Sequence, residues 1–212
     1  MSFPRLLIAT TNPGKFREFK QLLGDLPLRL ASLADLPGAP AVAEHGETYV
    51  ANATIKALSL ARWSGCASLA DDSGLEVDAL CGAPGVHSAR YAGVEQDGRA
   101  NLEKLLRALE SVSPSERTAR FRCVIVVACP DGATLVTEGS CEGRILEAPR
   151  GRGGFGYDPV FFYPPLNSAF AEVSAAVKNR VSHRARACTE LRTKLVSFLS
   201  AHAAACANCK LD

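Results

Sequence analysis

The amino-acid sequence predicts an α/β fold that includes antiparallel strand pairing. Two patterns alternate along its 212 residues: short apolar runs typical of buried strands, and apolar residues three or four positions apart, as on one face of a helix. A third observation adds the antiparallel part. The turn residues Pro130, Asp131 and Gly132 separate two long β-rich runs, 118–129 and 133–146, as they would in a hairpin. Strands and helices mixed in this way indicate an α/β protein.

The N-terminal third begins with a strand, a loop and a helix. Residues 5–9 form a short apolar run, and apolar residues at helical spacing follow from Phe16 to Leu23. A second strand is predicted near residues 28–33. Between residues 48 and 63 the apolar side chains again fall on one helical face, and the threonine at its start is a suitable N-cap.

The rest of the chain continues the alternation. Residues 101–109 are predicted to form an amphipathic helix before the hairpin. After the hairpin, the glycine cluster 151–156 leads into the aromatic run 157–163, and a last helix covers about 183–201. Because there is no internal repeat and no low-complexity linker, we expect a single domain.

The composition excludes some classes of partner. With 47% apolar and 22% charged residues the chain can bury a substantial core. Its net charge of +2 is too small to indicate nucleic acid or an anionic membrane as the main partner. No segment approaches the roughly 20 apolar residues of a membrane span, and the N-terminus lacks a signal-peptide pattern. We therefore expect a cytoplasmic protein.

The eight cysteines give no strong metal or redox signal. Six are scattered, and we interpret them as small buried side chains. The other two, Cys206 and Cys209, form a C-x-x-C pair, but no second pair or βαβ context accompanies it. We interpret residues 203–212 as a flexible C-terminal tail, whose role stays open.

Two adjacent carboxylates are the strongest candidates for chemistry. Asp71 and Asp72 end a short apolar run and lead into a predicted Ser73-Gly74 turn. Successive strand residues point to opposite faces, so one carboxylate can face a metal or substrate while the other braces the turn. Mg²⁺ prefers carboxylate oxygens and usually combines them with substrate phosphates. The alternative is a solvated turn, because Asp, Ser and Gly all favour turns.

A phosphate site is predicted where the first strand passes to the first helix, at residues 10–15. Free backbone N–H groups and the positive end of the helix dipole favour phosphate there. Gly14 allows close approach of the backbone, and Lys15 adds a positive charge. The alternative is an ordinary helix N-cap with proline at the first helical position.

A base site is predicted in the glycine-rich segment. Phe155 stands between two glycines, where an open ring is suited to stack on a base. Asp158 is suited to accept hydrogen bonds from a ring or sugar. The alternative is a glycine-rich turn with Phe155 packed inward.

Cations gather just before the last predicted helix, at Lys178, Arg180, His183 and Arg184. Ser182 is a suitable N-cap for that helix. Because cations oppose the dipole at a helix N-terminus, the cluster indicates a bound anion nearby. A solvated basic helix start is the alternative.

Six segments occur in an order that resembles the inosine/xanthosine triphosphate pyrophosphatases. They are residues 10–15, 48–53, 70–75, 82–91, 154–159 and 182–184. The resemblance implies an elongated α/β protein in which a long curved mixed sheet is flanked by helices, forming two lobes with a central cleft. It implies one nucleoside-triphosphate pyrophosphatase domain over residues 1–202, usually as a homodimer.

The resemblance also implies an activity and a set of site residues. The activity is Mg²⁺-dependent hydrolysis of ITP, dITP and XTP to the monophosphate and pyrophosphate, which keeps these bases out of DNA and RNA. Asp72 matches the proton acceptor and a metal ligand, Glu44 matches a second metal carboxylate, and Ser73 matches a substrate contact. The other nucleotide-binding positions matched are Thr10, Thr11, Asn12, Pro13, Gly14, Lys15, Phe155, Gly156, Tyr157, Asp158, Lys178, His183 and Arg184.

The chain departs from the family pattern in two places. Ala51 stands where many relatives have Glu, and Ala175-Ala176 replaces an acidic pair before Lys178. The first change would weaken metal binding if that Glu reached the metal.

Two other functions compete with this interpretation. One is a pyrophosphatase for pyrimidine or modified deoxynucleotides, against which segments 155–158 and 182–184 argue. The other is a module that senses nucleotides or binds nucleic acid without hydrolysis. Asp72 argues against an inactive sensor, and the near-neutral charge argues against nucleic acid. Base choice is expected to depend on donors from His183 and Arg184, which would pair with a 6-oxo group and not with a 6-amino group.

Overall fold

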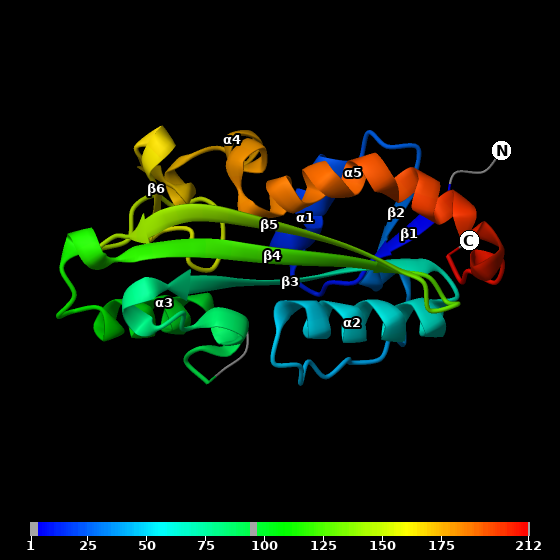
Figure 1. Cartoon of the computed structure of the whole chain (residues 1–212), viewed down its shortest axis with the longest axis horizontal. Helices are drawn as coiled ribbons and strands as arrows, with labels where there is room; N and C mark the ends of the chain where they lie inside the picture. Colours follow the sequence, from blue (N-terminus) through cyan, green and yellow to red (C-terminus); the bar gives the residue numbers. More distant parts are fainter. Residues whose placement is uncertain (1–3, 94–96, 212) are drawn as a thin grey trace. The chain divides into compact units, whose positions relative to one another are not determined.

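The computed structural model describes residues 4–93 and 97–211, and it confirms the mixed α/β fold (Figure 1). Within these residues, one seven-stranded sheet has the order β2-β1-β3-β4-β5-β6-β7. β1 pairs in parallel with β2 and β3, whereas β6 pairs antiparallel with β5 and β7. The strands are β1 (Arg5–Ile8), β2 (Arg29–Ser32), β3 (Ala67–Val77), β4 (Thr118–Ala128), β5 (Thr134–Ile145), β6 (Phe161–Tyr163) and β7 (Ser168–Ala169).

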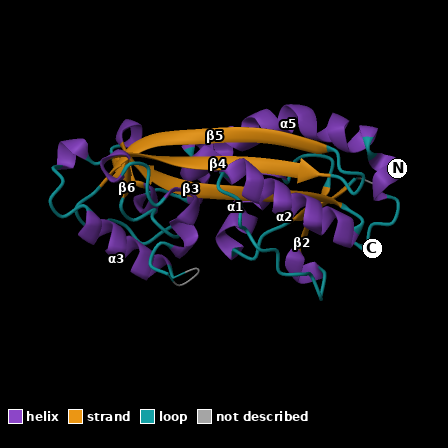
Figure 2. Cartoon of the chain, turned by 60° about the horizontal axis from the view of Figure 1, so that its bottom comes forward, coloured by secondary structure: helices purple, strands orange, loops and turns teal. Residues whose placement is uncertain are grey.

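A capping side chain precedes each of the α-helices in the described residues. They are α1 (Pro13–Leu23), α2 (Tyr49–Ser64), α3 (Gly98–Ala108), α4 (Ala175–Val181) and α5 (His183–Ala201) (Figure 2). Thr48 caps α2, and its side chain accepts a hydrogen bond from the Ala51 N–H at 3.2 Å. α3 begins three residues earlier than predicted because Asp97 caps it, accepting from the Ala100 N–H at 2.9 Å. The sequence analysis did not predict the short helix α4, although Ser174 caps it and accepts a hydrogen bond from the Val177 N–H at 3.3 Å.

The chain forms two compact units, each assembled from separate stretches. Unit 1 contains Met1–Asp72, Val124–Gly139 and Arg186–Asp212. Unit 2 contains Ser73–Cys123 and Ser140–Ala185. The division falls between Asp72 and Ser73, two consecutive candidate site residues. The central cleft predicted from the resemblance stays a prediction.

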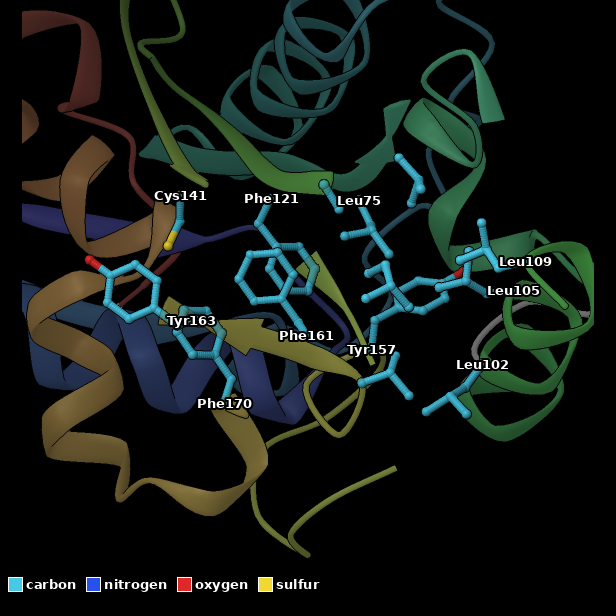
Figure 3. Packing of buried hydrophobic residues seen from close by; sticks show 14 residues of the cluster. Leu75, Leu102, Leu105, Leu109, Phe121, Cys141, Tyr157, Phe161, Tyr163 and Phe170 are labelled. Atoms are coloured by element: carbon cyan, nitrogen blue, oxygen red, sulfur yellow. The ribbon is translucent and has the colours of Figure 1, made fainter. Parts of the chain in front are cut away.

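Each unit has its own apolar core. In unit 1, small side chains of α2 such as Ala53 and Ala57 pack with β1, β3 and β4 residues such as Leu7, Ala70 and Val126. In unit 2 the core is aromatic: the ring centroids of Phe121 and Phe161 lie 4.5 Å apart, and those of Phe161 and Phe170 lie 5.0 Å apart (Figure 3). Rings at these distances contribute attraction beyond the area that they bury.

The C-terminal residues pack onto unit 1. Cys209 forms a disulfide with Cys66, 143 residues earlier, and Leu211 is buried in the core of the unit. The Lys210 N–H donates to the Ser64 carbonyl at 2.9 Å. Cys66 is buried as expected, but its disulfide was not predicted, because no spacing pattern reveals a partner so distant in sequence. The expectation of burial is wrong for Cys81, which is exposed. Flexibility of the tail stays a prediction, now for a segment anchored by this disulfide.

No helix in residues 4–93 and 97–211 combines the length and the apolar character that a membrane crossing requires.

Candidate active site

Local hydrogen bonds fix the loop between β1 and α1. The Asn12 Oδ1 accepts from the N–H groups of Gly14 at 2.8 Å and Lys15 at 3.2 Å, and Pro13 is the first helical residue. Thr10 is buried and its hydroxyl accepts from the Asn12 N–H at 3.2 Å, whereas Thr11 is exposed. The N-cap alternative is thus correct for Asn12. The N–H groups of Gly14 and Lys15, which were expected to bind phosphate, donate to the Asn12 side chain in this structure.

Lys15 links this helix start to strand β3. Its Nζ lies 3.0 Å from the Oδ2 of Asp71, whose side chain is almost fully buried. Asp71 therefore fixes the position of the lysine instead of bracing a turn. The predicted Ser73-Gly74 turn is wrong, and so is the alternative of a solvated turn that includes both aspartates, because β3 continues through these residues to Val77. Burial of Leu75 and Val77 in the core outweighs the local turn preference of these residues.

Asp72 occupies an environment that disfavours its charge. The side chain is 8% exposed, and its Oδ2 accepts a hydrogen bond from the Asn52 Nδ2 at 3.1 Å. Burial raises the pKa of Asp72 to about 6; Lys15 and the Asn52 hydrogen bond oppose this increase, and the nearby charges of Glu44 and Asp71 add to it. A carboxyl group with a pKa close to neutrality is suited to accept a proton.

Glu44 is held by a lysine that the sequence analysis missed. Its carboxylate forms an ion pair with the Nζ of Lys56 on α2. Asn52, the hydrogen-bond donor to Asp72, lies one turn earlier on the same helix. The available signal was this pair of polar residues at i and i+4, flanked by the buried Ala53 and Ala57.

These carboxylates fit a magnesium ion that arrives with a nucleotide. Within residues 4–93 and 97–211, no three His, Cys, Asp or Glu side chains form a group that could hold a metal. Mg²⁺ does not require such a group, because one or two carboxylates with phosphate oxygens and waters complete its shell. Besides burial, the negative charge of Glu44 repels that of Asp72 and adds to the rise in the pKa of Asp72. A bound cation would relieve this repulsion.

In unit 2 a buried ion pair holds the glycine-rich segment. The Lys178 Nζ lies 2.6 Å from the Oδ2 of Asp158, and both side chains are buried. The same oxygen accepts the Phe155 N–H at 2.9 Å, and the lysine Nζ lies 4.5 Å from the centre of the Phe155 ring. Asp158 and Lys178 therefore fix the backbone around Phe155. Their own contacts with a nucleotide stay predictions.

The Phe155 ring is half-buried, which lies between the stacking platform and the inward-packed ring of the two interpretations. Gly154 has φ +70°, and a Cβ there would meet the Asp158 Oδ2 at 2.1 Å, so only glycine fits. Gly156 is exposed. Tyr157 is buried in the core, and its hydroxyl donates to the Ser88 carbonyl at 2.9 Å, so its side chain serves packing in this structure.

The first two residues of α5, His183 and Arg184, have buried side chains. His183 stacks on Phe121 with ring centroids 4.7 Å apart. The Arg184 side chain is 1% exposed, and its Nη2 donates to the Ser73 hydroxyl at 3.0 Å. Ser182 caps the helix as predicted, accepting from the Ala185 N–H at 3.2 Å.

The predicted site residues therefore fall into connected groups within each unit. Unit 1 contains the group of Lys15, Glu44, Asn52, Lys56, Asp71 and Asp72. Unit 2 contains the group of Phe155, Asp158 and Lys178 and the pair of Ser73 and Arg184.

Known proteins share this sequence and fold. The sequence model of the Ham1 family matches residues 6–194. The chain is 51% identical over 186 residues to the dITP/XTP pyrophosphatase of Geobacillus kaustophilus (strain HTA426), covering 88% of this chain and 91% of that protein. It is 53% identical over 194 residues to the dITP/XTP pyrophosphatase of Syntrophobacter fumaroxidans (strain DSM 10017 / MPOB), covering 92% and 83% respectively.

Among solved structures, the HAM1 protein from Coxiella burnetii is similar, with a TM-score of 0.83 and 40% identity over 92% of this chain and 99% of that one. The nucleoside-triphosphatase / dITP/XTP pyrophosphatase of Mycobacterium abscessus ATCC 19977 / DSM 44196 has a TM-score of 0.70 and 39% identity, covering 88% and 97%.

Proposed function

The chain belongs to the Ham1 family, and from that premise we propose that it is a nucleoside-triphosphate pyrophosphatase for deaminated purine nucleotides, ITP, dITP and XTP. Relatives about half identical to it over most of its length are named dITP/XTP pyrophosphatases. One observation carries the proposal at the level of residues. Asp72 is a buried carboxylate with a pKa of about 6, and it lies close to Lys15, Asp71 and Glu44. This arrangement can combine a group that accepts a proton with a lysine that binds phosphate.

Asp72 acts as the general base in the proposed reaction. In the metal-free protein its pKa of about 6 leaves it ionised at neutral pH, and in the proposed reaction it orients and deprotonates the attacking water. Mg²⁺ held by Asp72 and Glu44 would supply charge neutralisation at the phosphate oxygens when bound. Asp71 holds Lys15, whose ammonium group binds the triphosphate. Cleavage of a phosphoanhydride depends mainly on such positioning and charge stabilisation.

In the proposed function, the site residues of unit 2 recognise the nucleobase of the substrate. Arg184, fixed by Ser73, and His183, stacked on Phe121, present donors suited to a 6-oxo group. Adenine has a 6-amino donor at that position. If adenine bound, the buried donors of Arg184 and His183 would have no acceptor, and this would reduce the binding free energy. The half-buried Phe155 provides the stacking surface, because Asp158 and Lys178 hold its backbone in place.

Magnesium as the metal, a homodimer and a cytoplasmic location stay predictions, and the homodimer rests on the resemblance alone.

The test is an assay of products from ITP, dITP and XTP with Mg²⁺, compared with ATP, GTP and dCTP. We expect equal amounts of the nucleoside monophosphate and pyrophosphate from the deaminated purines, and no release after removal of the metal with EDTA. Orthophosphate as the first product would place cleavage at the γ position and overturn the proposal. Faster hydrolysis of dCTP than of ITP would favour the competing pyrimidine specificity.

A further inference from the structure

A single buried side chain connects the three segments that carry the candidate metal site. Asn52 lies on α2 and is 1% exposed. Its Nδ2 donates to the Oδ2 of Asp72 on β3 at 3.1 Å, and its Oδ1 accepts from the Gly46 N–H at 2.7 Å. Gly46 is two residues from Glu44. The amide group thus bonds directly to one candidate metal carboxylate and to the loop of the other.

The contact between the Gly46 backbone and the Asn52 amide depends on the absence of a side chain at position 46. An added Cβ at Gly46 would lie 2.7 Å from the Ala51 Cβ and 2.8 Å from the Asn52 Oδ1, so only glycine brings the loop backbone this close to the amide. The Asn52 amide suits both bonds, because it supplies a donor for Asp72 and an acceptor for Gly46 without charge. An apolar side chain would leave the Gly46 N–H and an Asp72 oxygen without these partners.

We propose that Asn52 is a positioning residue, which sets Asp72 and the Glu44 loop at the separation that a divalent cation needs. This inference rests on the proposed function. Asn52 acts through Asp72 and the Gly46 backbone, so it need not touch the nucleotide. Lys56, one turn later on α2, holds the Glu44 side chain. Helix α2 therefore orients both carboxylates, and groups that orient metal ligands strongly affect metal affinity.

The alternative is that Asn52 only satisfies buried backbone groups. The chain offers a matched control for that role in Asn101 on α3, which is 3% exposed. Its Oδ1 accepts from the Ala92 N–H at 2.6 Å, and its Nδ2 donates to the Ala89 carbonyl at 3.1 Å. Both residues are buried asparagines with two hydrogen bonds, but only the bonds of Asn52 include a carboxylate.

The experiment compares Asn52→Leu with Asn101→Leu, using Mn²⁺ alone as the probe and no nucleotide. Electron paramagnetic resonance measures free Mn²⁺ and hence the dissociation constant, and Asp72→Asn identifies which binding belongs to this site. We expect Asn52→Leu to weaken Mn²⁺ binding about 10- to 100-fold. Asn101→Leu should leave the dissociation constant unchanged, although thermal unfolding in EDTA should show that both variants are destabilised.

A second variant keeps the test decisive if Asn52→Leu does not fold. Gly46→Ala, in a half-exposed loop, pushes the loop away from the amide and leaves the Asn52 bond to Asp72 available. It should also weaken Mn²⁺ binding, by less than Asn52→Leu.

If Asn52→Leu and Gly46→Ala folded and bound Mn²⁺ as tightly as the wild type, the inference about Asn52 would be overturned. The proposed pyrophosphatase function would still stand. If the wild-type protein released no pyrophosphate and bound no Mn²⁺ through Asp72, the proposed function and this inference would both fail.

Discussion

The Nζ of Lys15 lies 3.0 Å from the Oδ2 of Asp71, the residue directly before Asp72. The ion pair neutralises one of two consecutive carboxylates and fixes a lysine at the start of α1. Asp72, on the opposite side of the strand, accepts a hydrogen bond from the neutral amide of Asn52 and has a pKa of about 6. The two aspartates therefore have different environments, and their substitution should have different effects.

Replacing Asp72 with Asn should lower kcat for ITP by about 10²- to 10⁴-fold, because it removes the general base and one metal carboxylate. Asp71→Asn should cause a smaller loss, seen mainly as a higher KM, because Lys15 loses its fixed position. Steady-state pyrophosphate release at saturating Mg²⁺ separates the two parameters. Equal losses of kcat in the two variants would show that these roles are assigned wrongly.

The same residue should make stability depend on pH in the metal-free protein. Folding raises the pKa of Asp72 from 3.8 to about 6, so the folded state binds its proton more tightly than the unfolded state. This stabilisation is present below pH 3.8 and is lost as the pH rises through 6. Asp72→Asn avoids the buried charge, and in EDTA at pH 7.5 its free energy of unfolding should exceed that of the wild type by up to about 3 kcal/mol.

Urea unfolding at pH 5 and pH 7.5 checks this expectation, because the advantage of the variant should shrink at the lower pH. Asp71→Asn is the control: it leaves Lys15 without this carboxylate and should be destabilising at pH 7.5. A stability difference between wild type and Asp72→Asn that did not change with pH would contradict the prediction.

Local signals predicted much of the secondary structure. Thr48 and Ser182 cap the helices that they were expected to cap, and the hairpin turn at residues 130–132 separates β4 from β5. These features depend on neighbours in sequence, so a linear pattern contains them. The continuation of β3 through Asp71–Gly74 was not predictable in this way, because core packing overrides the turn preference.

The site itself was predictable in its residues but not in their pairing. The charge of Lys15 was expected to meet phosphate, and its partner Asp71 is apparent only once β1 and β3 are adjacent in the sheet. The same holds for Asn52 and Asp72, which come from a helix and a strand. Such contacts depend on strand order, and spacing in the sequence does not encode it.

Gly154→Ala should disrupt the segment that holds Phe155. At φ +70° the new Cβ would meet the Asp158 Oδ2 at 2.1 Å, so the carboxylate must release Lys178 or the Phe155 N–H. We expect a loss of about 1–3 kcal/mol in stability together with a higher KM for ITP. Gly132→Ala, at φ +96° in the hairpin turn, is the control for backbone strain alone, because the new Cβ would meet only an Arg62 side-chain nitrogen at the ordinary contact distance of 3.9 Å. Its KM should equal that of the wild type.

Cys209→Ser should destabilise the oxidised protein by about 2–5 kcal/mol, because the disulfide to Cys66 closes a long loop in the unfolded chain. With dithiothreitol present, wild type and variant should unfold at nearly the same urea concentration. Cys206→Ser, which changes a neighbouring free thiol in the same tail, is the control and should keep the redox difference. If dithiothreitol left the wild-type midpoint unchanged, the disulfide would not contribute to stability.

Arg184→Lys should narrow the preference for ITP over ATP in kcat/KM, with a smaller change in kcat for ITP. The guanidinium is buried and donates to the Ser73 hydroxyl at 3.0 Å, so its planar set of donors has a fixed direction. Lysine offers a point charge on a flexible stem and cannot reproduce that geometry. Ser73→Ala should weaken discrimination in the same direction, because it releases one anchor of the arginine. The ratio of kcat/KM values for ITP and ATP measures the effect. A uniform drop for both nucleotides would place Arg184 on the phosphates, and base discrimination would then have to depend on Phe155 and His183.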